Sequence, residues 1–247
     1  MRSEARYAVE VPEFLGDWYR GVVDFAGGTP GFVQDFMAHF TELGIIALMG
    51  VWAVMWWRTR AAPSRAMALA LLGPVGVVVA YALSEGAKVL VDEERPCRTF
   101  ADVSIIAQTC PPTGDWSFPS NHSTINGALV IAIMMVSWRV GLVMLPFGML
   151  GAFSRVFVGV HYPHDVLVGF LLGAAVTAVL VLALAGPVTR LVEALRANAA
   201  LARLLVAGGQ PPPAPAPPLV SERIGPGLYQ SQSSSPRRGD EEHTVRE

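Results

Sequence analysis

The sequence predicts an all-α protein, a polytopic membrane bundle with five to six transmembrane helices. Three observations support this fold class. Only 15% of the 247 residues are Asp, Glu, Lys or Arg, against about 25% in ordinary soluble domains. Hydrophobic residues make up 52% of the chain, and the mean hydropathy is +0.43. The few charges are also unevenly spread, and they leave long charge-free segments of the kind that a lipid-facing helix requires.

Five segments contain no charged residue: residues 43–57, 66–84, 123–138, 140–154 and 166–189. A spanning helix needs about 20 mainly apolar residues, and the second and fifth segments have that length by themselves. The other three reach it with their uncharged or amphipathic flanks. The alternative is a soluble bundle of buried helices, but five such segments so close together would leave it almost no polar surface.

The two ends of the chain differ from this middle region. Residues 11–25 mix aromatic with charged side chains, a pattern typical of a helix that lies in the membrane interface. The end of the chain is rich in Pro and Ser, and such a segment buries too little apolar surface to fold. The sequence therefore divides into an N-terminal amphipathic segment, a transmembrane domain, a juxtamembrane helix and a disordered tail, at residues 1–40, 41–190, 191–207 and 208–247.

Arginines set the expected orientation. The connections after the first and third spans carry Arg58, Arg60, Arg65 and Arg139, and further arginines follow the fifth span. All these places fall on one side of a five-span bundle, although Arg2 and Arg6 fall on the other. Because cytoplasmic loops carry the excess of Lys and Arg, we expect the tail to be cytoplasmic. The connections at residues 85–122 and 155–165 are then extracytoplasmic.

The chain has two cysteines, Cys97 and Cys110, and both fall in the longer outer connection. An extracytoplasmic compartment permits disulfides, so we expect the two to be paired, with two free thiols as the alternative. The formal net charge of −2 gives no bulk electrostatic reason for nucleic-acid binding.

The outer connections also hold three polar clusters. In the first, Lys88 and Arg95 lie two helical turns apart on one face if the second span continues that far, and Pro96 then ends the helix. Two cations that point the same way can clamp an anion. The alternative is a pair of cations that snorkel at the membrane edge beside the neighbouring acidic residues.

The second cluster, residues 118–123, precedes the third span. Ser120 and Asn121 are suited to the start of a helix, whose free N–H groups and dipole bind anions. His122 would lie at the rim of that site and could donate a proton. An ordinary helix cap with a solvated histidine is the alternative.

The third cluster contains Arg155, His161 and Asp165. The carboxylate is close enough in sequence to hold one ring nitrogen of the histidine and leave the other free to attack. The guanidinium suits phosphate oxygens. A structural Asp–His pair is again the alternative, but the three clusters together have the parts that phosphoryl transfer requires without a metal.

The clusters resemble the three-part signature of the type 2 phosphatidic acid phosphatase (PAP2) family, K-x6-RP, PSGH and SR-x5-H-x3-D. Here the parts are Lys88 to Pro96, residues 119–122, and Ser154 to Asp165, and Asn121 stands where the commonest motif has Gly. The resemblance extends to the spans at roughly 41–190, although the family usually has six spans.

The resemblance implies a role for each residue. His161 would be the nucleophile that forms a phosphohistidine, Asp165 would orient it, and His122 would be the general acid. The phosphoryl oxygens would be bound by Lys88, Arg95, Ser120, Asn121 and Arg155. No metal or cofactor is expected. The partners would be membrane lipids and a lipid phosphate substrate, in the inner cell membrane, with the site facing outward.

Residues 117–122 and 158–167 resemble bacterial undecaprenyl-diphosphate phosphatases of the same family, so a polyprenyl diphosphate is the preferred substrate. Phosphatidate and phosphatidylglycerophosphate phosphatases are the alternatives. Two other classes of membrane protein also remain as alternatives. His122, His161, His164 and Asp165 could form the metal site of an enzyme or transporter, but three nearby cations would repel the ion. A non-catalytic lipid-binding protein could use the same fold. The oligomeric state does not follow from the sequence.

Overall fold

The computed structural model describes residues 12–198, and every regular element in that range is a helix. In chain order the helices are α1 (Glu13–Gly27), α2 (Gly31–Thr59), α3 (Ser64–Val91), α4 (Pro96–Thr99), α5 (Asn121–Val136), α6 (Trp138–Phe157) and α7 (Pro163–Ala197). The predicted all-α class is therefore confirmed. The last turns of α7 cover residues 191–197, which we expected in a separate juxtamembrane helix. The predicted tail and the first residues of the chain lie outside the described range.

Four helices, α2, α3, α6 and α7, are long and apolar enough to cross a membrane, and α5 is a shorter apolar helix of 16 residues. These five helices correspond to the five charge-free segments of the sequence. The protein is thus a multi-pass membrane protein. Many large hydrophobic side chains on these helices point outward, as expected where lipid surrounds the bundle.

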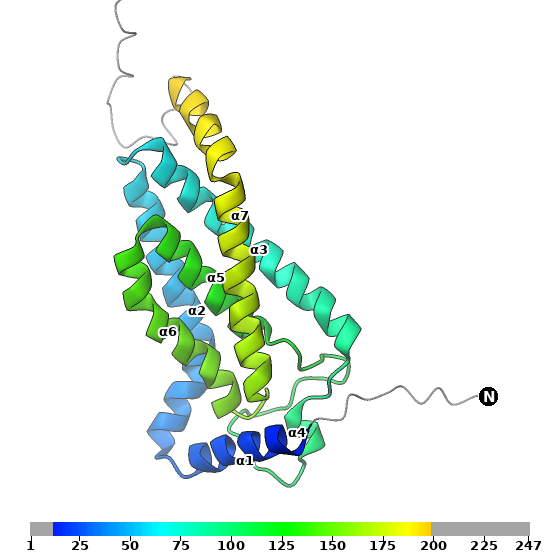
Figure 1. Cartoon of the computed structure of the whole chain (residues 1–247). Coiled ribbons are helices and arrows are strands. Elements are labelled where there is room, and N and C mark those ends of the chain that lie inside the picture. The colour runs from blue at the N-terminus through cyan, green and yellow to red at the C-terminus, as the bar shows by residue number, and fades with distance from the viewer. Residues whose placement is uncertain (1–11, 199–247) are drawn as a thin grey trace, which may run out of the picture. The chain divides into compact units, whose positions relative to one another are not determined.

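Helix α5 is the centre of the bundle and packs against α2, α3, α6 and α7 (Figure 1). Small residues allow its close approach to α7. A Cβ atom at Gly127 would collide with the carbonyl group of Phe170, and one at Gly173 would collide with that of Thr124. Glycine at these positions lets the two backbones touch, as is common between helices in membranes. The close contact fixes the start of α5 beside the start of α7.

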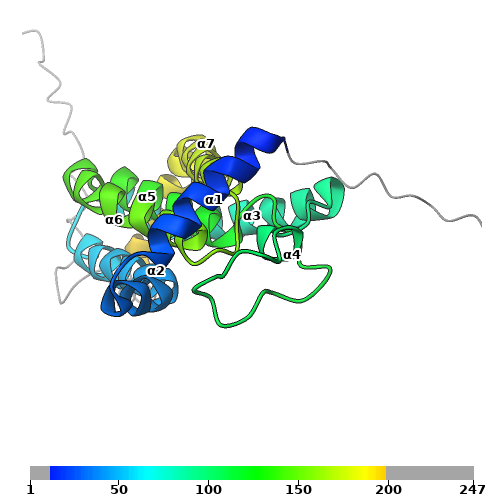
Figure 2. The same ribbon diagram turned by 90° about the horizontal axis from the view of Figure 1, so that it is seen from below.

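Helix α1 runs across the end of the bundle and contacts α6 and α7 (Figures 1 and 2). Tyr19 fixes it there, because its hydroxyl donates to the carbonyl oxygen of Gly159 at 3.0 Å and its ring packs against Phe100 and Tyr162. The contact ties α1 to both connections at this end, the one between α3 and α5 and the one between α6 and α7. These are the two connections that hold the polar clusters.

Candidate active site

His161 lies in the short loop between α6 and α7, and its side chain is only 2% exposed. Its Nδ1 is 3.3 Å from Oδ2 of Asp165, and its Nε2 is 3.0 Å from Nη1 of Arg95. Since a carboxylate only accepts and a guanidinium only donates, Nδ1 carries the ring proton and Nε2 keeps its lone pair. The structure thus leaves the lone pair of the ring on Nε2, on the side of Arg95.

Asp165 is fully buried in the first turn of α7. Its Oδ2 accepts hydrogen bonds from Oγ of Ser117 at 2.5 Å and from the backbone N–H of Tyr162 at 2.9 Å. The second bond closes the start of α7, in the manner of a capping box. The same carboxylate therefore fixes the helix start and the tautomer of His161.

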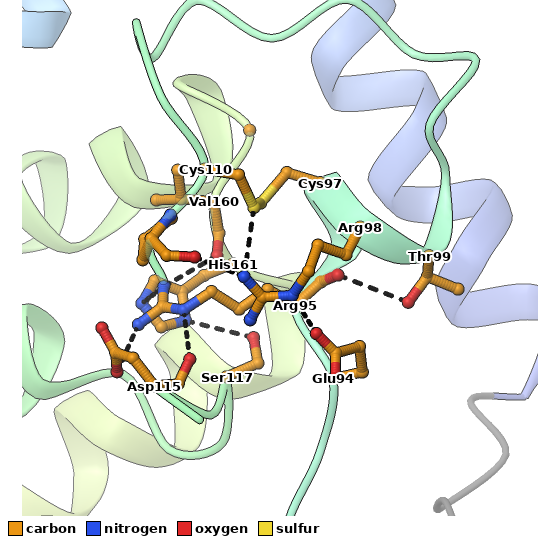
Figure 3. Close-up of a disulfide and its surroundings, with 12 residues drawn as sticks. Glu94, Arg95, Cys97, Arg98, Thr99, Cys110, Asp115, Ser117, Val160 and His161 are labelled. Carbon is orange, nitrogen blue, oxygen red and sulfur yellow. Dashed lines mark hydrogen bonds and ion pairs between the residues drawn. A yellow bond between two sulfur atoms is a disulfide. The ribbon is translucent and has the colours of Figure 1, made fainter. Parts of the chain in front are cut away.

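Lys88 and Arg95 converge on a residue that the sequence did not suggest, Asp115. Its Oδ1 accepts from Nζ of Lys88 at 3.0 Å and from Nη2 of Arg95 at 2.9 Å, and Figure 3 shows it beside Arg95 and His161. Burial would raise the pKa of Asp115, but its bonds to Lys88 and Arg95 hold that pKa below its usual range. The two cations therefore bind an anionic oxygen, as the interpretation of an anion clamp requires.

The start of α5 brings the second cluster to the same place. The backbone N–H of Ser120 donates to the carbonyl oxygen of Asp165 at 3.1 Å, and His122 contacts Glu42 of α2, with 2.7 Å between Nε2 and Oε1. The side chain of Asn121 bonds Ser84 and Glu85 of α3, which leaves the prediction of phosphate binding to its backbone. What this residue can offer a phosphoryl group is its backbone N–H in the first turn of α5.

Arg155 lies near the end of α6, where its Nη1 donates to Oγ1 of Thr41 at 3.0 Å. Its positive charge also acts on His161. The pKa of His161 lies well below its usual range, first because the ring is buried and then because Arg95, Arg155, Lys88 and His122 place positive charge nearby. The residues predicted from three separate motifs therefore share one electrostatic environment, and it keeps His161 neutral.

Cys97 and Cys110 form a disulfide, with their Cα atoms 5.9 Å apart. It closes the connection between α3 and α5 directly after Arg95, as Figure 3 shows. The residues between Cys110 and α5 include Asp115 and Ser117. The disulfide thus restrains the backbone on both sides of the anion clamp.

The structure adds contacts that motif spacing did not indicate. Ser117 bonds Asp165, Glu42 contacts His122, and Asp115 bridges the two cations. The metal set considered from the sequence is not assembled in the described residues. His164 and Asp165 are grouped there with Glu93, their ligand atoms within 4.8 Å of one another, while His122 contacts Glu42.

Comparisons with known proteins identify the family of the chain. Residues 68–186 match the PAP2 superfamily. The undecaprenyl-diphosphatase BcrC of Bacillus subtilis is 30% identical over 60% of this chain and 71% of its own length. The decaprenylphosphoryl-5-phosphoribose phosphatase of Mycobacterium tuberculosis is 36% identical over 58% of this chain and 74% of its own length.

Two solved structures share the fold. The LpxE protein of Aquifex aeolicus superposes with a TM-score of 0.56 at 18% identity, over 70% of this chain and 97% of its own. A PAP2 type phosphatidylglycerolphosphate phosphatase of Bacillus subtilis superposes with a TM-score of 0.51 at 19% identity, over 68% of this chain and 85% of its own.

Proposed function

This chain belongs to the PAP2 superfamily of lipid phosphatases, and on that premise we propose that it removes the terminal phosphate of a polyprenyl diphosphate through a phosphohistidine at His161. The observation that carries the proposal is the arrangement of His161 between Asp165 and Arg95. It leaves the Nε2 lone pair directed at Arg95, one of the cations that would hold a phosphoryl group.

In the first step, Nε2 of His161 attacks phosphorus, an N–P bond forms, and the bond from phosphorus to the leaving oxygen breaks. Asp165 holds the Nδ1 proton and stabilises the positive charge that develops on the ring. Lys88, Arg95 and Arg155 stabilise the charge on the equatorial oxygens, together with the N–H groups at the start of α5. His122 gives a proton to the leaving lipid phosphate.

In the second step, water attacks the phosphohistidine, the N–P bond breaks, and inorganic phosphate leaves. His122, now without its extra proton, takes one from the water. Glu42, whose carboxylate accepts from His122, supports the protonated form of that ring. For substrate to bind, its phosphoryl group must replace the carboxylate of Asp115 on Lys88 and Arg95.

A hydrophobic groove supports a lipid substrate. It lies where α1, α6 and α7 meet and has a volume of about 530 Å³. Val22, Ala152, Val156 and Val166 are among the side chains that line it, and Pro163 brings it next to the catalytic loop. An isoprenoid chain in this groove would keep its phosphate beside His161, at the membrane surface.

A second candidate substrate class is a polyprenylphosphoryl sugar phosphate, by analogy with the mycobacterial relative. A polar hollow of about 730 Å³ favours it, between α2 and residues 104–111, with Thr41 and Arg155 in its wall. This hollow could hold a sugar between the two phosphates. Phosphatidate and phosphatidylglycerophosphate are the remaining alternatives.

The test is phosphate release in detergent from undecaprenyl diphosphate, a polyprenylphosphoryl phosphoribose, phosphatidate and phosphatidylglycerophosphate, all on one preparation. We expect kcat/KM to be at least about tenfold higher for the diphosphate, which corresponds to about 1.4 kcal/mol of transition-state stabilisation. Equal or faster hydrolysis of phosphatidate would contradict the proposed substrate. His161→Gln, purified in the same way, controls for contaminating phosphatases.

We also propose that the site faces outward, in the inner cell membrane, and that the tail is cytoplasmic. Arg58, Arg60 and Arg65 support this, since α2 and α3 place them at the end opposite to His161. The native cysteines are paired, so single reporters can be added. An impermeant maleimide on intact cells should label Thr113→Cys but not Ala61→Cys, and the reverse pattern would invert the topology.

A further inference from the structure

His164 lies between two buried carboxylates, one of which belongs to the site. Its Nε2 is 3.0 Å from Oε1 of Glu93 and 3.2 Å from Oδ1 of Asp165. The side chains of Glu93 and Asp165 are 4% and 0% exposed. The same Nε2 hydrogen-bonds Oε2 of Glu93 at 3.2 Å, so the imidazole bonds one acid and lies at ion-pair distance from the other.

The contacts around His164 hold its ring in this position. The ring stacks against Phe118 and Tyr162, with centroid distances of 5.9 and 5.4 Å. Glu93 is fixed through its backbone, whose carbonyl oxygen accepts from the N–H of Ser117 at 2.8 Å. His164 therefore joins three segments of the site, namely the two ends of the α3–α5 connection and the first turn of α7.

Two carboxylates this close in a buried place repel each other, and one of them takes up a proton unless a cation lies between them. Lys88 and Arg95 do not fill that role, because both contact Asp115 on the other side of the site. A protonated Asp165 would lose the charge that orients His161 and stabilises its positive form. His161 also contacts Asp165, but burial and nearby positive charge hold the pKa of His161 well below its usual range. Among the described contacts of Glu93 and Asp165, this leaves His164 to supply the cation.

We propose that His164 is a positioning residue whose imidazolium keeps Asp165 charged beside Glu93, and so sets the lowest pH at which His161 can act. The proposal rests on the function proposed above. Two acids contact His164, namely Glu93 from the α3–α5 connection and Asp165 from α7. The other titratable groups packed against these three residues are His161 and Tyr162, from the loop before α7. Arg95 lies beyond His161.

The test is the pH dependence of kcat/KM for His164→Gln, which keeps an N–H donor at the same place but cannot carry the charge. We expect the acid limb of the profile to move up by about one pH unit or more, so that activity falls about tenfold near neutral pH and recovers in alkali. A profile that is lowered equally at every pH would mean a merely structural role and would overturn the proposal.

A second substitution, at Glu93, should reverse the effect of His164→Gln on the pH profile. In the Glu93→Gln, His164→Gln double variant the second carboxylate charge is also gone, so the acid limb should return toward its wild-type position. A double variant with the same or a larger shift would contradict the counter-ion role. Arg139→Gln, which removes a charge at the start of α6 away from Glu93 and Asp165, should leave the wild-type profile.

A readout without substrate separates this inference from the proposed function. His164→Gln should lower the melting temperature in detergent at neutral pH, and the added Glu93→Gln should restore part of it, because contacting residues couple. Additive losses would overturn the inference even if no substrate is turned over. A stoichiometric metal ion in the wild-type protein that is absent from His164→Gln would also overturn it. Conversely, if no lipid in the panel released phosphate, the proposed function would be refuted. The coupling between Glu93 and His164 would still be measurable from the melting temperatures.

Discussion

Nη1 of Arg95 lies 3.0 Å from Nε2 of His161, so the cation that would hold a phosphoryl oxygen already contacts the atom that would attack phosphorus. The same guanidinium bonds the carbonyl oxygen of Val160 and both the backbone and side chain of Asp115. Arg95 therefore connects the nucleophile to the anion clamp before any substrate binds.

Arg95→Lys should reduce kcat/KM by roughly 100-fold, although the positive charge is kept. A lysine cannot make the several directed bonds of the planar guanidinium, and loss of one charge-stabilising donor typically costs a factor of this size. Steady-state kinetics on the preferred lipid measures the loss. Arg98→Lys, three residues further along, should stay within about threefold of wild type, and an equal loss in both variants would contradict the specific role of Arg95.

Asp115→Asn should tighten inhibition by phosphate and vanadate. The lowered pKa of Asp115 keeps its carboxylate charged at working pH, where it competes with phosphate for Lys88 and Arg95. Removal of that charge should lower the inhibition constant of phosphate by about tenfold, or roughly 1.4 kcal/mol. An unchanged or weaker inhibition constant would show that Asp115 does not occupy the place of the phosphoryl group.

The lowered pKa of His161 predicts a loss of stability in mild acid. Below about pH 6.5 this histidine is protonated in the unfolded chain but stays neutral in the folded chain. The stabilising contribution is therefore fully present above pH 6.5 and decreases as the pH falls toward the folded-state pKa. Melting temperatures from pH 8 to pH 5 should fall more steeply for wild type than for His161→Gln. Parallel curves would contradict a depressed pKa.

Loss of the Cys97–Cys110 disulfide should destabilise the protein by about 3 kcal/mol, by the loop-closure estimate. It should also raise KM more than it lowers kcat, because the bond restrains the segments that carry Arg95 and Asp115. Melting and kinetics of the Cys97→Ser, Cys110→Ser double variant measure both effects. Dithiothreitol should reproduce them in wild type and leave the double variant unchanged, and a wild-type protein indifferent to reduction would refute the prediction.

Composition and charge-free segments were enough to predict the helical class and the five apolar segments, and motif spacing was enough to predict the residues around His161, because each depends on local sequence. Lys88, Arg95, His122 and Asp165 come together since α3, α5 and α7 start or end at one end of the bundle. The contacts of Asp115 and Glu42 could not be predicted, because they depend on how a long connection and a neighbouring helix fold over the site. The direction of the Asn121 side chain could not be predicted either, because it depends on how α3 packs against α5.

The most direct test of the account is to trap the covalent intermediate. Enzyme mixed with lipid substrate labelled in its terminal phosphate, and quenched within milliseconds under alkaline conditions, should carry an acid-labile phosphoryl group on His161, found by mass spectrometry of the peptide. His161→Gln should carry none. A phosphoryl group on another residue, or turnover by His161→Gln at the wild-type rate, would contradict the assignment of the nucleophile.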